Sequence, residues 1–471
     1  MKMKYLLILL LIQFAIGLCN AQFTVLLNFN DTNGSVPHGS LIRIGNTLFG
    51  MTPQGGTLGY GCVFAIDTNG TKYKDLHDFN NINGNGPFGV LTFLNGKFFG
   101  MTQMGGANSY GCVFSMDTNG NNYKDIFDFN KTNGAGPYGS LTSLGSLLYG
   151  MTYSGGVNDS GCVFSIDTSG GKYKDLLDFN KSKGRNPYGS IIISGVKLYG
   201  MTYAGGAKDF GCVFSVDTNG NNYKDLFDFN KANGAYPQGD LVYSNGSLFG
   251  MTSLGGAHDS GCIFSMDTNG NKYKDMVDFN LKNGYLPQGS LTLSGSALYG
   301  FTTEYNALSS HSIPATIGSI FLIDTNGSNF ENLYEFYYSV GGRPPGFPIG
   351  SPVISGNVLY GMTMWGNPSL NGVVFSLTNI TENIENFDYA SNCKVYPNPS
   401  KGLFNFQTNS QSLMANSRIE VYNMLGEQIY SHPFSAPRTS LNLTGQPAGI
   451  YFYRITSEKG ELLGSGKLIK Q

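Results

Sequence analysis

The sequence predicts an all-β protein: a seven-bladed β-propeller of four-stranded blades, closed by the N-terminal strand and followed by a small C-terminal β-sandwich. Three observations support this fold class. A unit of about 50 residues recurs seven times between residues 23 and 377. Each unit alternates apolar and polar residues with the period of two that is typical of strands. Glycine-rich turns separate these runs, and the chain holds 66 Gly with 33 Phe and 29 Tyr.

One repeat, Gly139 to Asn180, shows the four strands of a blade, which we name a to d in chain order. The expected strands cover residues 139–144, 146–152, 162–167 and 173–179. An Asp-Thr-Asn-Gly segment, or a close variant, joins strands c and d, and Asn-Gly suits the positive φ of a tight hairpin. Because one such unit cannot bury its own apolar face, the repeats must pack on each other as a solenoid or a propeller.

The count of strands favours a closed ring. Strand a begins seven times, at Gly39, Gly89, Gly139, Gly189, Gly239, Gly289 and Gly350. Strand d follows strand c only six times, and residues 23–30 match the strand-d segment 73–80. We therefore expect the N-terminal strand to complete the seventh blade, which leaves no blade unfinished. An open solenoid would need polar capping repeats, and none is evident.

Composition and the chain ends indicate the compartment. The net charge of −2 and the 13% of charged residues argue against nucleic-acid binding. Residues 1–21 have the basic start, the short apolar run and the small-residue cleavage site of a secretory signal peptide, which we prefer to lipidation at Cys19. No transmembrane segment is expected. The predicted domains are the signal peptide (1–21), the propeller (22–377), a linker (378–393) and the β-sandwich (394–471).

Five cysteines occupy one position of successive strands c, which invites a disulfide or metal interpretation. They are Cys62, Cys112, Cys162, Cys212 and Cys262. Strand c lies two strand spacings outside strand a, so neighbouring copies are at least ~8 Å apart. A disulfide requires Cα atoms within about 7 Å. We therefore interpret these cysteines as small buried strand residues, and we predict neither a metal site nor a cofactor.

The candidate site lies on the face where the d–a and b–c connections meet. The residues just before strand a vary between blades and lie near the mouth of the central channel: His38, Phe88, Tyr138, Tyr188, Gln238, Gln288 and Ile349. The b–c loops add Tyr153, Tyr203 and Trp365, along with Tyr60, Tyr110 and Phe210. Aromatic rings and amides at a concave mouth suit the binding of a glycan or a protein. In a second interpretation, the Pro-aromatic pairs only plug the channel and pack neighbouring blades.

Two further functions stay open. Asp159, Asp209 and Asp259 recur in three consecutive b–c loops, and such carboxylates are the groups that an extracellular polysaccharide hydrolase or lyase needs. The near-identity of blades two to five argues mildly against this function, because an active site usually breaks the symmetry at one place. A purely structural surface protein is the other alternative.

Sequence motifs in the C-terminal module and in the repeats each resemble those of a known family. Tyr396 to Pro399, Ile419 to Gly426 and Ala448 to Ile455 closely resemble the type A C-terminal sorting domain of the type IX secretion system. The resemblance implies export to the outer cell surface of a Gram-negative bacterium, with the type IX machinery as a partner. The repeats, as at Leu148 to Asp167, resemble the GloVer tandem repeat and share the four-strand blade of kelch-like propellers. That family implies no established activity.

Overall fold

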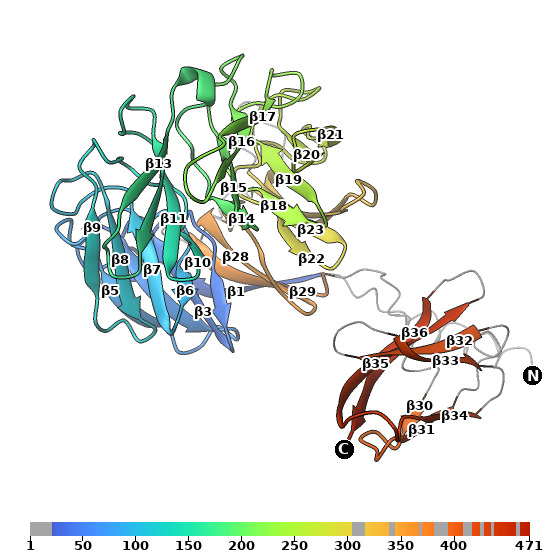
Figure 1. Cartoon of the computed structure of the whole chain (residues 1–471). Coiled ribbons are helices and arrows are strands. Elements are labelled where there is room, and N and C mark those ends of the chain that lie inside the picture. Colours follow the sequence, from blue (N-terminus) through green and yellow to red (C-terminus); the bar gives the residue numbers. More distant parts are fainter. Residues whose placement is uncertain are drawn as a thin grey trace, which may run out of the picture. The chain divides into compact units, whose positions relative to one another are not determined.

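A computed structural model describes residues 21–303, 316–338, 344–366, 370–380, 394–407, 417–423, 428–434, 438–457 and 462–471. The expected signal peptide, apart from residue 21, and most of the expected linker lie outside these residues, as do Cys19 and Cys393. The chain forms two compact units, Met1–Ile380 and Thr381–Gln471 (Figure 1). Both are built of antiparallel sheets, so the expected all-β class is confirmed.

The described part of the first unit holds six four-stranded sheets and one five-stranded sheet. The first three sheets are β2 (Ile42–Ile44), β3 (Thr47–Thr52), β4 (Cys62–Asp67) and β5 (Lys74–Asp78); β6 (Thr92–Leu94), β7 (Lys97–Thr102), β8 (Cys112–Asp117) and β9 (Lys124–Asp128); β10 (Thr142–Leu144), β11 (Leu147–Thr152), β12 (Cys162–Asp167) and β13 (Lys174–Asp178). The next three are β14 (Ile192–Ser194), β15 (Lys197–Thr202), β16 (Cys212–Asp217) and β17 (Lys224–Asp228); β18 (Val242–Ser244), β19 (Ser247–Thr252), β20 (Cys262–Asp267) and β21 (Lys274–Asp278); β22 (Thr292–Ser294), β23 (Ala297–Thr302), β24 (Thr316–Asp324) and β25 (Glu331–Tyr337).

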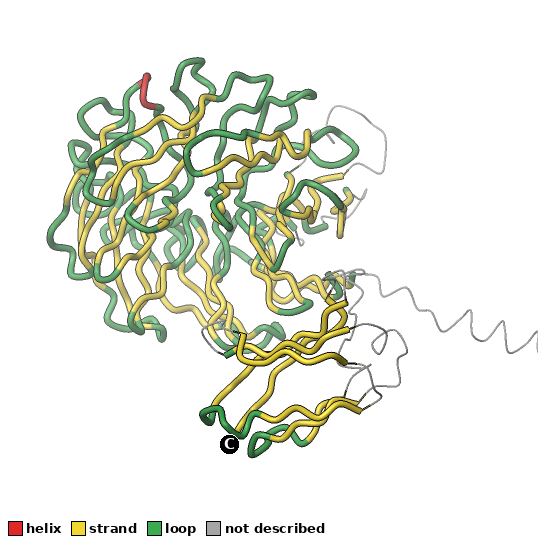
Figure 2. The backbone as a smooth tube through the Cα atoms, turned by 45° about the vertical axis from the view of Figure 1, so that its right-hand side comes forward, coloured by secondary structure: helices red, strands yellow, loops and turns green. Residues whose placement is uncertain are grey.

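The five-stranded sheet combines the two ends of the unit. Its strands are β1 (Gln22–Asn28), β29 (Val373–Thr378), β28 (Val358–Trp365), β26 (Gly346–Pro348) and β27 (Val353–Ser355). β1 pairs antiparallel with β29, from Gln22 opposite Thr378 to Asn28 opposite Val373. The only helical element in the described part of the chain is a short 3₁₀ turn, Lys181–Lys183, so Figure 2 shows almost nothing but strands and loops.

Strands b and c form the long ladder of each sheet. In the third sheet β11 pairs with β12 without interruption from Leu147 opposite Asp167 to Thr152 opposite Cys162. Gly150 lies opposite Phe164 in this ladder, and a Cβ atom at Gly150 would come within 2.6 Å of the Phe164 ring. Glycine is therefore required there, because the buried phenylalanine ring covers its backbone.

Strand a is shorter than the sequence predicts. In the third sheet it covers only Thr142–Leu144, whereas residues 139–144 were expected. A Cβ atom at Gly139 would lie 2.3 Å from the carbonyl oxygen of Gly189, in the next repeat. The first residues of the expected strand thus approach the neighbouring repeat, so they do not continue the ladder of their own sheet.

The core lies between consecutive sheets. One buried cluster combines Tyr149 and Val163 of the third sheet with Leu198 and Phe214 of the fourth. Equivalent clusters join the other consecutive sheets. A further cluster joins the first sheet to the last, and it contains Phe29, Leu41, Leu48, Phe64, Ile66, Tyr360, Met362 and Val374. Each sheet thus buries its apolar faces against its neighbours.

The repeated cysteines are buried thiols within these layers. The Cys162 sulfur lies 3.3 Å from Thr152 Oγ1, and the Cys162 N–H donates to the same oxygen. Burial raises the pKa of Cys162 to about 12, so the thiol is protonated at neutral pH. In the sixth sheet Ser319 takes this position and contacts Thr302 Oγ1 at 2.7 Å. Val373 takes the position in the five-stranded sheet, opposite Thr363, so the position suits a small side chain that is either polar or apolar.

The second unit consists of two sheets around one core. The sheets are β30 (Lys394–Tyr396), β31 (Leu403–Gln407) and β34 (Arg438–Asn442); and β33 (Gln428–Phe434), β32 (Ser417–Tyr422), β35 (Gly449–Ser457) and β36 (Leu462–Lys470). Phe404 and Leu441 of the first sheet share one buried cluster with Ile419, Tyr453 and Leu468 of the second. Two sheets packed through a common core is the arrangement of a β-sandwich. Among the described residues there is no helix long and apolar enough to cross a bilayer.

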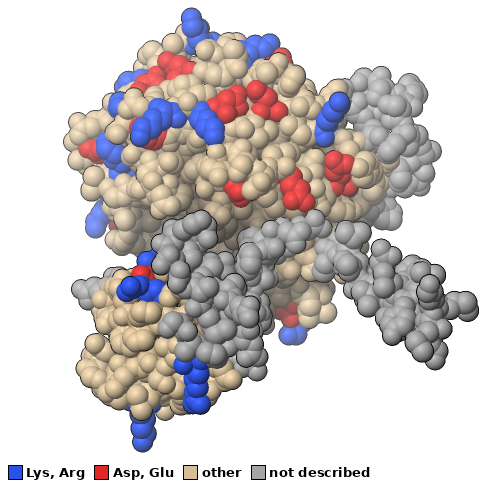
Figure 3. All heavy atoms as spheres, turned by 90° about the vertical axis from the view of Figure 1, so that its right-hand side faces the viewer, with Lys and Arg blue, Asp and Glu red and all other residues tan. Residues whose placement is uncertain are grey.

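Carboxylate pairs recur on the outermost strands of the first unit. On β9, Asp128 Oδ1 accepts a hydrogen bond of 2.6 Å from the Ala107 N–H. Burial, followed by repulsion from Asp128, raises the pKa of the neighbouring Asp125 to about 6. Burial, followed by repulsion from the aspartate three residues further on, likewise raises the pKa to about 6 at four equivalent positions: Asp75, Asp175, Asp225 and Asp275. Acidic and basic side chains both occur on the face of the molecule that Figure 3 shows.

We predict that Asp125→Asn stabilises the protein more at pH 7.5 than at pH 5. A carboxyl whose pKa is raised by folding stabilises the fold below its unfolded pKa, near 4, and loses that contribution as pH rises through about 6. The substitution removes the repulsion at pH 7.5, where the wild-type group is charged. Thermal melts at both pH values measure the effect. Burial lowers the pKa values of His38 and His77, so these groups destabilise the fold as the pH falls. They do so equally in the wild type and in the variant. An equal shift at both pH values would contradict the prediction.

A second prediction concerns the joining of the chain ends. Phe29 is fully buried, and its ring packs edge-on against Phe64 at 5.3 Å. We expect Phe29→Ala to lower the free energy of unfolding by about 3–5 kcal/mol, as for other buried phenylalanines. Phe179→Ala, at the matching position within the chain, is the control, and urea denaturation is the measurement. A loss at position 179 with none at position 29 would show that the N-terminal segment does not contribute to the core.

Candidate functional site

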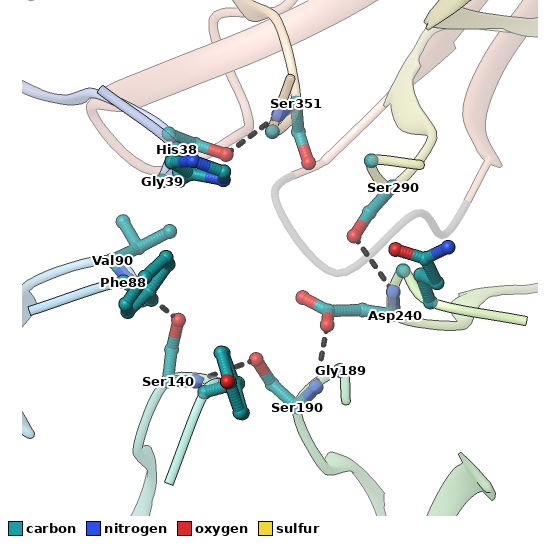
Figure 4. A pocket seen from close by; sticks show the side chains of 18 of the residues that line it. His38, Gly39, Phe88, Val90, Ser140, Gly189, Ser190, Asp240, Ser290 and Ser351 are labelled. Carbon is teal, nitrogen blue, oxygen red and sulfur yellow. Dashed lines mark hydrogen bonds between the residues drawn. The ribbon is translucent and has the colours of Figure 1, made fainter. Parts of the chain in front are cut away.

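A cavity of about 140 Å³ opens where the seven repeats approach one another (Figure 4). Each repeat contributes three consecutive residues that follow a proline and precede strand a, with glycine in the middle. The first positions are His38, Phe88, Tyr138, Tyr188, Gln238, Gln288 and Ile349. The third positions are Ser40, Val90, Ser140, Ser190, Asp240, Ser290 and Ser351. All seven residues that the sequence predicts before strand a therefore line one cavity.

Hydrogen bonds connect the third positions of neighbouring repeats. The N–H of Ser140 donates to Ser190 Oγ at 2.8 Å, and the N–H of Ser190 donates to Asp240 Oδ1 at 2.5 Å. The N–H of Asp240 in turn donates to Ser290 Oγ at 2.7 Å. The Val90 N–H donates to Ser140 Oγ, and the Ser351 N–H to Ser40 Oγ. These bonds hold the cavity wall in place, as the dashed lines in Figure 4 show.

The first positions form an aromatic arc on one side of the cavity. We use this name for His38, Phe88, Tyr138 and Tyr188. Each ring contacts the next: the centroids of His38 and Phe88 lie 4.9 Å apart, those of Phe88 and Tyr138 5.1 Å, and those of Tyr138 and Tyr188 4.3 Å. Gln238, Gln288 and Ile349 complete the circle. The cavity is therefore aromatic on one side and carries two amides on the other.

The electrostatics of the cavity depend on four titratable residues among those that line it. Burial lowers the pKa of His38 to about 4, so its imidazole is neutral at pH 7. Burial also raises the pKa values of Tyr138 and Tyr188, which stay protonated phenols. Asp240 is the fourth group, and burial raises the pKa of its carboxyl. The lining includes neither Lys nor Arg.

Aromatic residues of the b–c loops pack against the tyrosines of the aromatic arc. The Tyr153 ring packs edge-on against both Tyr138 and Tyr188, at 5.3 and 5.5 Å. Tyr203 contacts Tyr188 at 6.0 Å and Tyr236 at 5.0 Å. Backbone hydrogen bonds tie these loops to the d–a connections, and the Gly136 N–H donates to the Tyr110 carbonyl. The two kinds of connection thus share one face, but Tyr153 and Tyr203 do not line the cavity.

Trp365 lies in a strand and not in the loop where the sequence places it. The sequence places it in the last b–c loop, whereas the structure includes it in β28, opposite Gly346 of β26. Its ring packs on Phe347 with centroids 4.4 Å apart, and it is not among the residues that line the cavity. An extra pairing with β26 extends β28 past the point where the other strands b end, and this explains the difference.

The three repeated loop carboxylates organise their own turns. Asp159 Oδ1 accepts from the Gly155 N–H at 3.0 Å, and its carboxylate lies 3.3 Å from Lys131 Nζ. Asp259 makes the same contacts with Gly255 and Lys231. Asp209 accepts from Gly205 and pairs with Arg185, and its pKa is lowered. These carboxylates cap the Gly-Gly turns of their own loops and pair with basic side chains.

Sequence reasoning missed the third positions of the cavity triplets. A serine recurs at this position in five repeats, which makes the position look like framework, and Asp240 lies in the same series. The signal was present, since an aspartate replaces serine at this position in one repeat only. No group of three or more His, Cys, Asp or Glu residues suitable for a metal ion is found within the described ranges.

No curated protein matches the sequence significantly. Solved structures give distant likenesses. The chain is similar to PorZ, a surface component of the type IX secretion system of Porphyromonas gingivalis (13% identity, 93% of this chain and 59% of PorZ covered, TM-score 0.43). It is also similar to an oligogalacturonate lyase from Vibrio parahaemolyticus (9%, 76% of this chain and 97% of the lyase, TM-score 0.46). TM-scores under 0.5 do not establish a shared fold, so neither likeness carries a conclusion about this chain.

Family models match both parts of the chain. The model of the secretion system C-terminal sorting domain matches residues 394–471, which indicates export by the type IX machinery to the cell surface or beyond it. The model of the Gloeobacter/Verrucomicrobia repeat matches residues 12–156 and 143–314, well over half of the sequence. Both resemblances expected from the sequence motifs are confirmed. The chain therefore belongs to the Gloeobacter/Verrucomicrobia repeat family and ends in a type IX sorting domain.

Proposed function

We propose that this protein is an exported seven-bladed β-propeller, closed by β1, which binds carbohydrate at the cavity between its repeats. The pairing of β1 with β29 and the core cluster that joins the first sheet to the last support the closed ring. The domain boundaries expected from the sequence, with the propeller ending near residue 377 and the sorting domain beginning at residue 394, belong to the same proposal.

The observation that carries the binding function is the two-sided lining of the cavity. The aromatic arc presents four rings on one side, and the amides of Gln238 and Gln288 lie on the other. A sugar ring has an apolar face of C–H groups and a polar rim of hydroxyls. Aromatic faces suit the former, and amides can both donate to and accept from the latter. We therefore favour a glycan over a protein as the ligand.

The rival functions find less support. A polysaccharide hydrolase or lyase would need Asp159, Asp209 or Asp259 free for acid-base work, but each carboxylate is held by a turn and a basic side chain. A purely structural role for the arc would explain the ring contacts. It would not explain why amides replace aromatics at two of the seven positions, next to the single aspartate of the lining.

We expect Tyr188→Ala to weaken glycan binding at least tenfold, because the substitution removes the ring at the end of the arc that Tyr138, Tyr153 and Tyr203 all contact. A loss of that size corresponds to about 1.4 kcal/mol. The measurement is a glycan array with the full mature chain, followed by calorimetric titration with the ligand that it identifies.

Tyr243→Ala is the matched control, since Tyr243 is a tyrosine of the same unit, 42% exposed and outside the cavity. Thermal melts confirm that both variants fold. Equal glycan binding by the Tyr188 variant and the wild type would rule out the arc as the binding surface. Binding to a protein, with no glycan bound, would favour the alternative partner.

A further inference from the structure

One residue breaks the symmetry of the cavity wall. Asp240 takes the third position of its triplet, where five other repeats have serine and one has Val90. Its Oδ1 accepts the Ser190 N–H, so it replaces the serine hydroxyl as the link between repeats. A serine would make that link without introducing a charge. The carboxylate therefore supplies something that the architecture does not require.

The carboxylate has no cationic partner among the lining residues. Asp240 is half-buried in the wall, and the other titratable groups that line the cavity are His38, Tyr138 and Tyr188. His38 is neutral at pH 7, and both phenols are protonated. A partly buried carboxylate is stabilised by an opposite charge that comes within about 4–6 Å of it. Burial has the expected effect and raises the pKa of Asp240.

The surroundings of Asp240 suit an ammonium group. In Figure 4 its carboxylate reaches into the cavity from the side opposite Phe88 and Val90. An ammonium has three N–H donors and therefore needs acceptors in several directions. Besides the carboxylate, the amide oxygens of Gln238 and Gln288 and the hydroxyls of Ser190 and Ser290 belong to the same part of the lining. Phe88 of the aromatic arc lies across the cavity in Figure 4, where its ring can contact the apolar face of a sugar ring.

We infer that the cavity recognises an amino sugar with a free ammonium group, and that Asp240 pairs with that ammonium while the aromatic arc contacts the sugar ring. This inference rests on the proposed function and specifies its ligand. N-acetylation removes the positive charge, so the acetylated sugar cannot form the ion pair. The site should therefore distinguish the two forms of one sugar.

The test compares two oligosaccharides that differ only in acetylation. Glucosamine tetramer and N-acetylglucosamine tetramer are titrated into the full mature chain at pH 6, where the amino group of glucosamine carries a proton, and into Asp240→Ser. This variant restores the serine that five other repeats carry, so the hydrogen bond to Ser190 can be kept. We expect the wild type to bind the glucosamine tetramer at least tenfold more tightly than the acetylated tetramer. The variant should bind both alike. Asp159→Asn, which removes a carboxylate outside the cavity, is the control and should retain the preference.

The outcomes separate this inference from the proposed function. Equal affinity of the wild type for the two tetramers, with binding lost in Tyr188→Ala, would overturn the ammonium site but leave carbohydrate binding intact. An undiminished preference in Asp240→Ser would overturn the role of Asp240. Binding of a lysine-bearing peptide, with no oligosaccharide bound by the wild type on array or titration, would overturn both proposals. The affinity of the wild type for the glucosamine tetramer is also measured as the pH is lowered. A fall in this affinity at pH values still above the usual pKa of aspartate, with no such fall in Asp240→Ser, would support the ion pair.

Discussion

The architecture of the first unit depends on apolar packing between sheets that are each too small to fold alone. A four-stranded sheet with a three-residue inner strand has two faces and little interior, so its aromatic residues are buried only when a neighbour covers them. Phe164 of β12 and Phe179, which directly follows β13, are fully buried in this way. The unit therefore gains its stability from the contacts between repeats, and its first and last sheets need each other as much as any inner pair does.

The same packing determines what the cavity can be. Because the glycines before strand a approach the next repeat within a distance that excludes a Cβ atom, the residues on either side of them are brought together. The flanking positions are then free to vary, since the glycine backbone and the neighbouring hydroxyls hold the wall. This separation of framework and lining explains how one circle can carry aromatic rings, amides and a carboxylate on an almost uniform scaffold.

Much of this could be predicted from the sequence, for identifiable reasons. Strand c was expected at residues 162–167 and forms there, because its alternation and its glycine boundaries are unambiguous. Strand a was expected to be longer, since nothing in a single repeat shows that Gly139 approaches Gly189 of another. Asn119 and Gly120 were both expected to have positive φ in the turn from Asp117 to Gly120, but only Gly120 does. The Asp117 side chain accepts a hydrogen bond from the Asn119 N–H and so caps the turn instead.

The cavity lining was predicted by position, but Asp240 was hidden by its place in a repeating series. Trp365 was misplaced because strand length depends on β26, a partner that the sequence pattern does not reveal.

The position of β29 has a mechanical consequence. This strand is the last of the first unit, and it carries hydrogen-bond ladders on both edges, with β1 on one side and β28 on the other. Tension applied to the chain beyond Thr378 acts on a strand held from two directions and must shear both ladders together. An edge strand in that place would peel away one bond at a time. The N-terminal segment thus reinforces the attachment point of everything that follows it along the polypeptide.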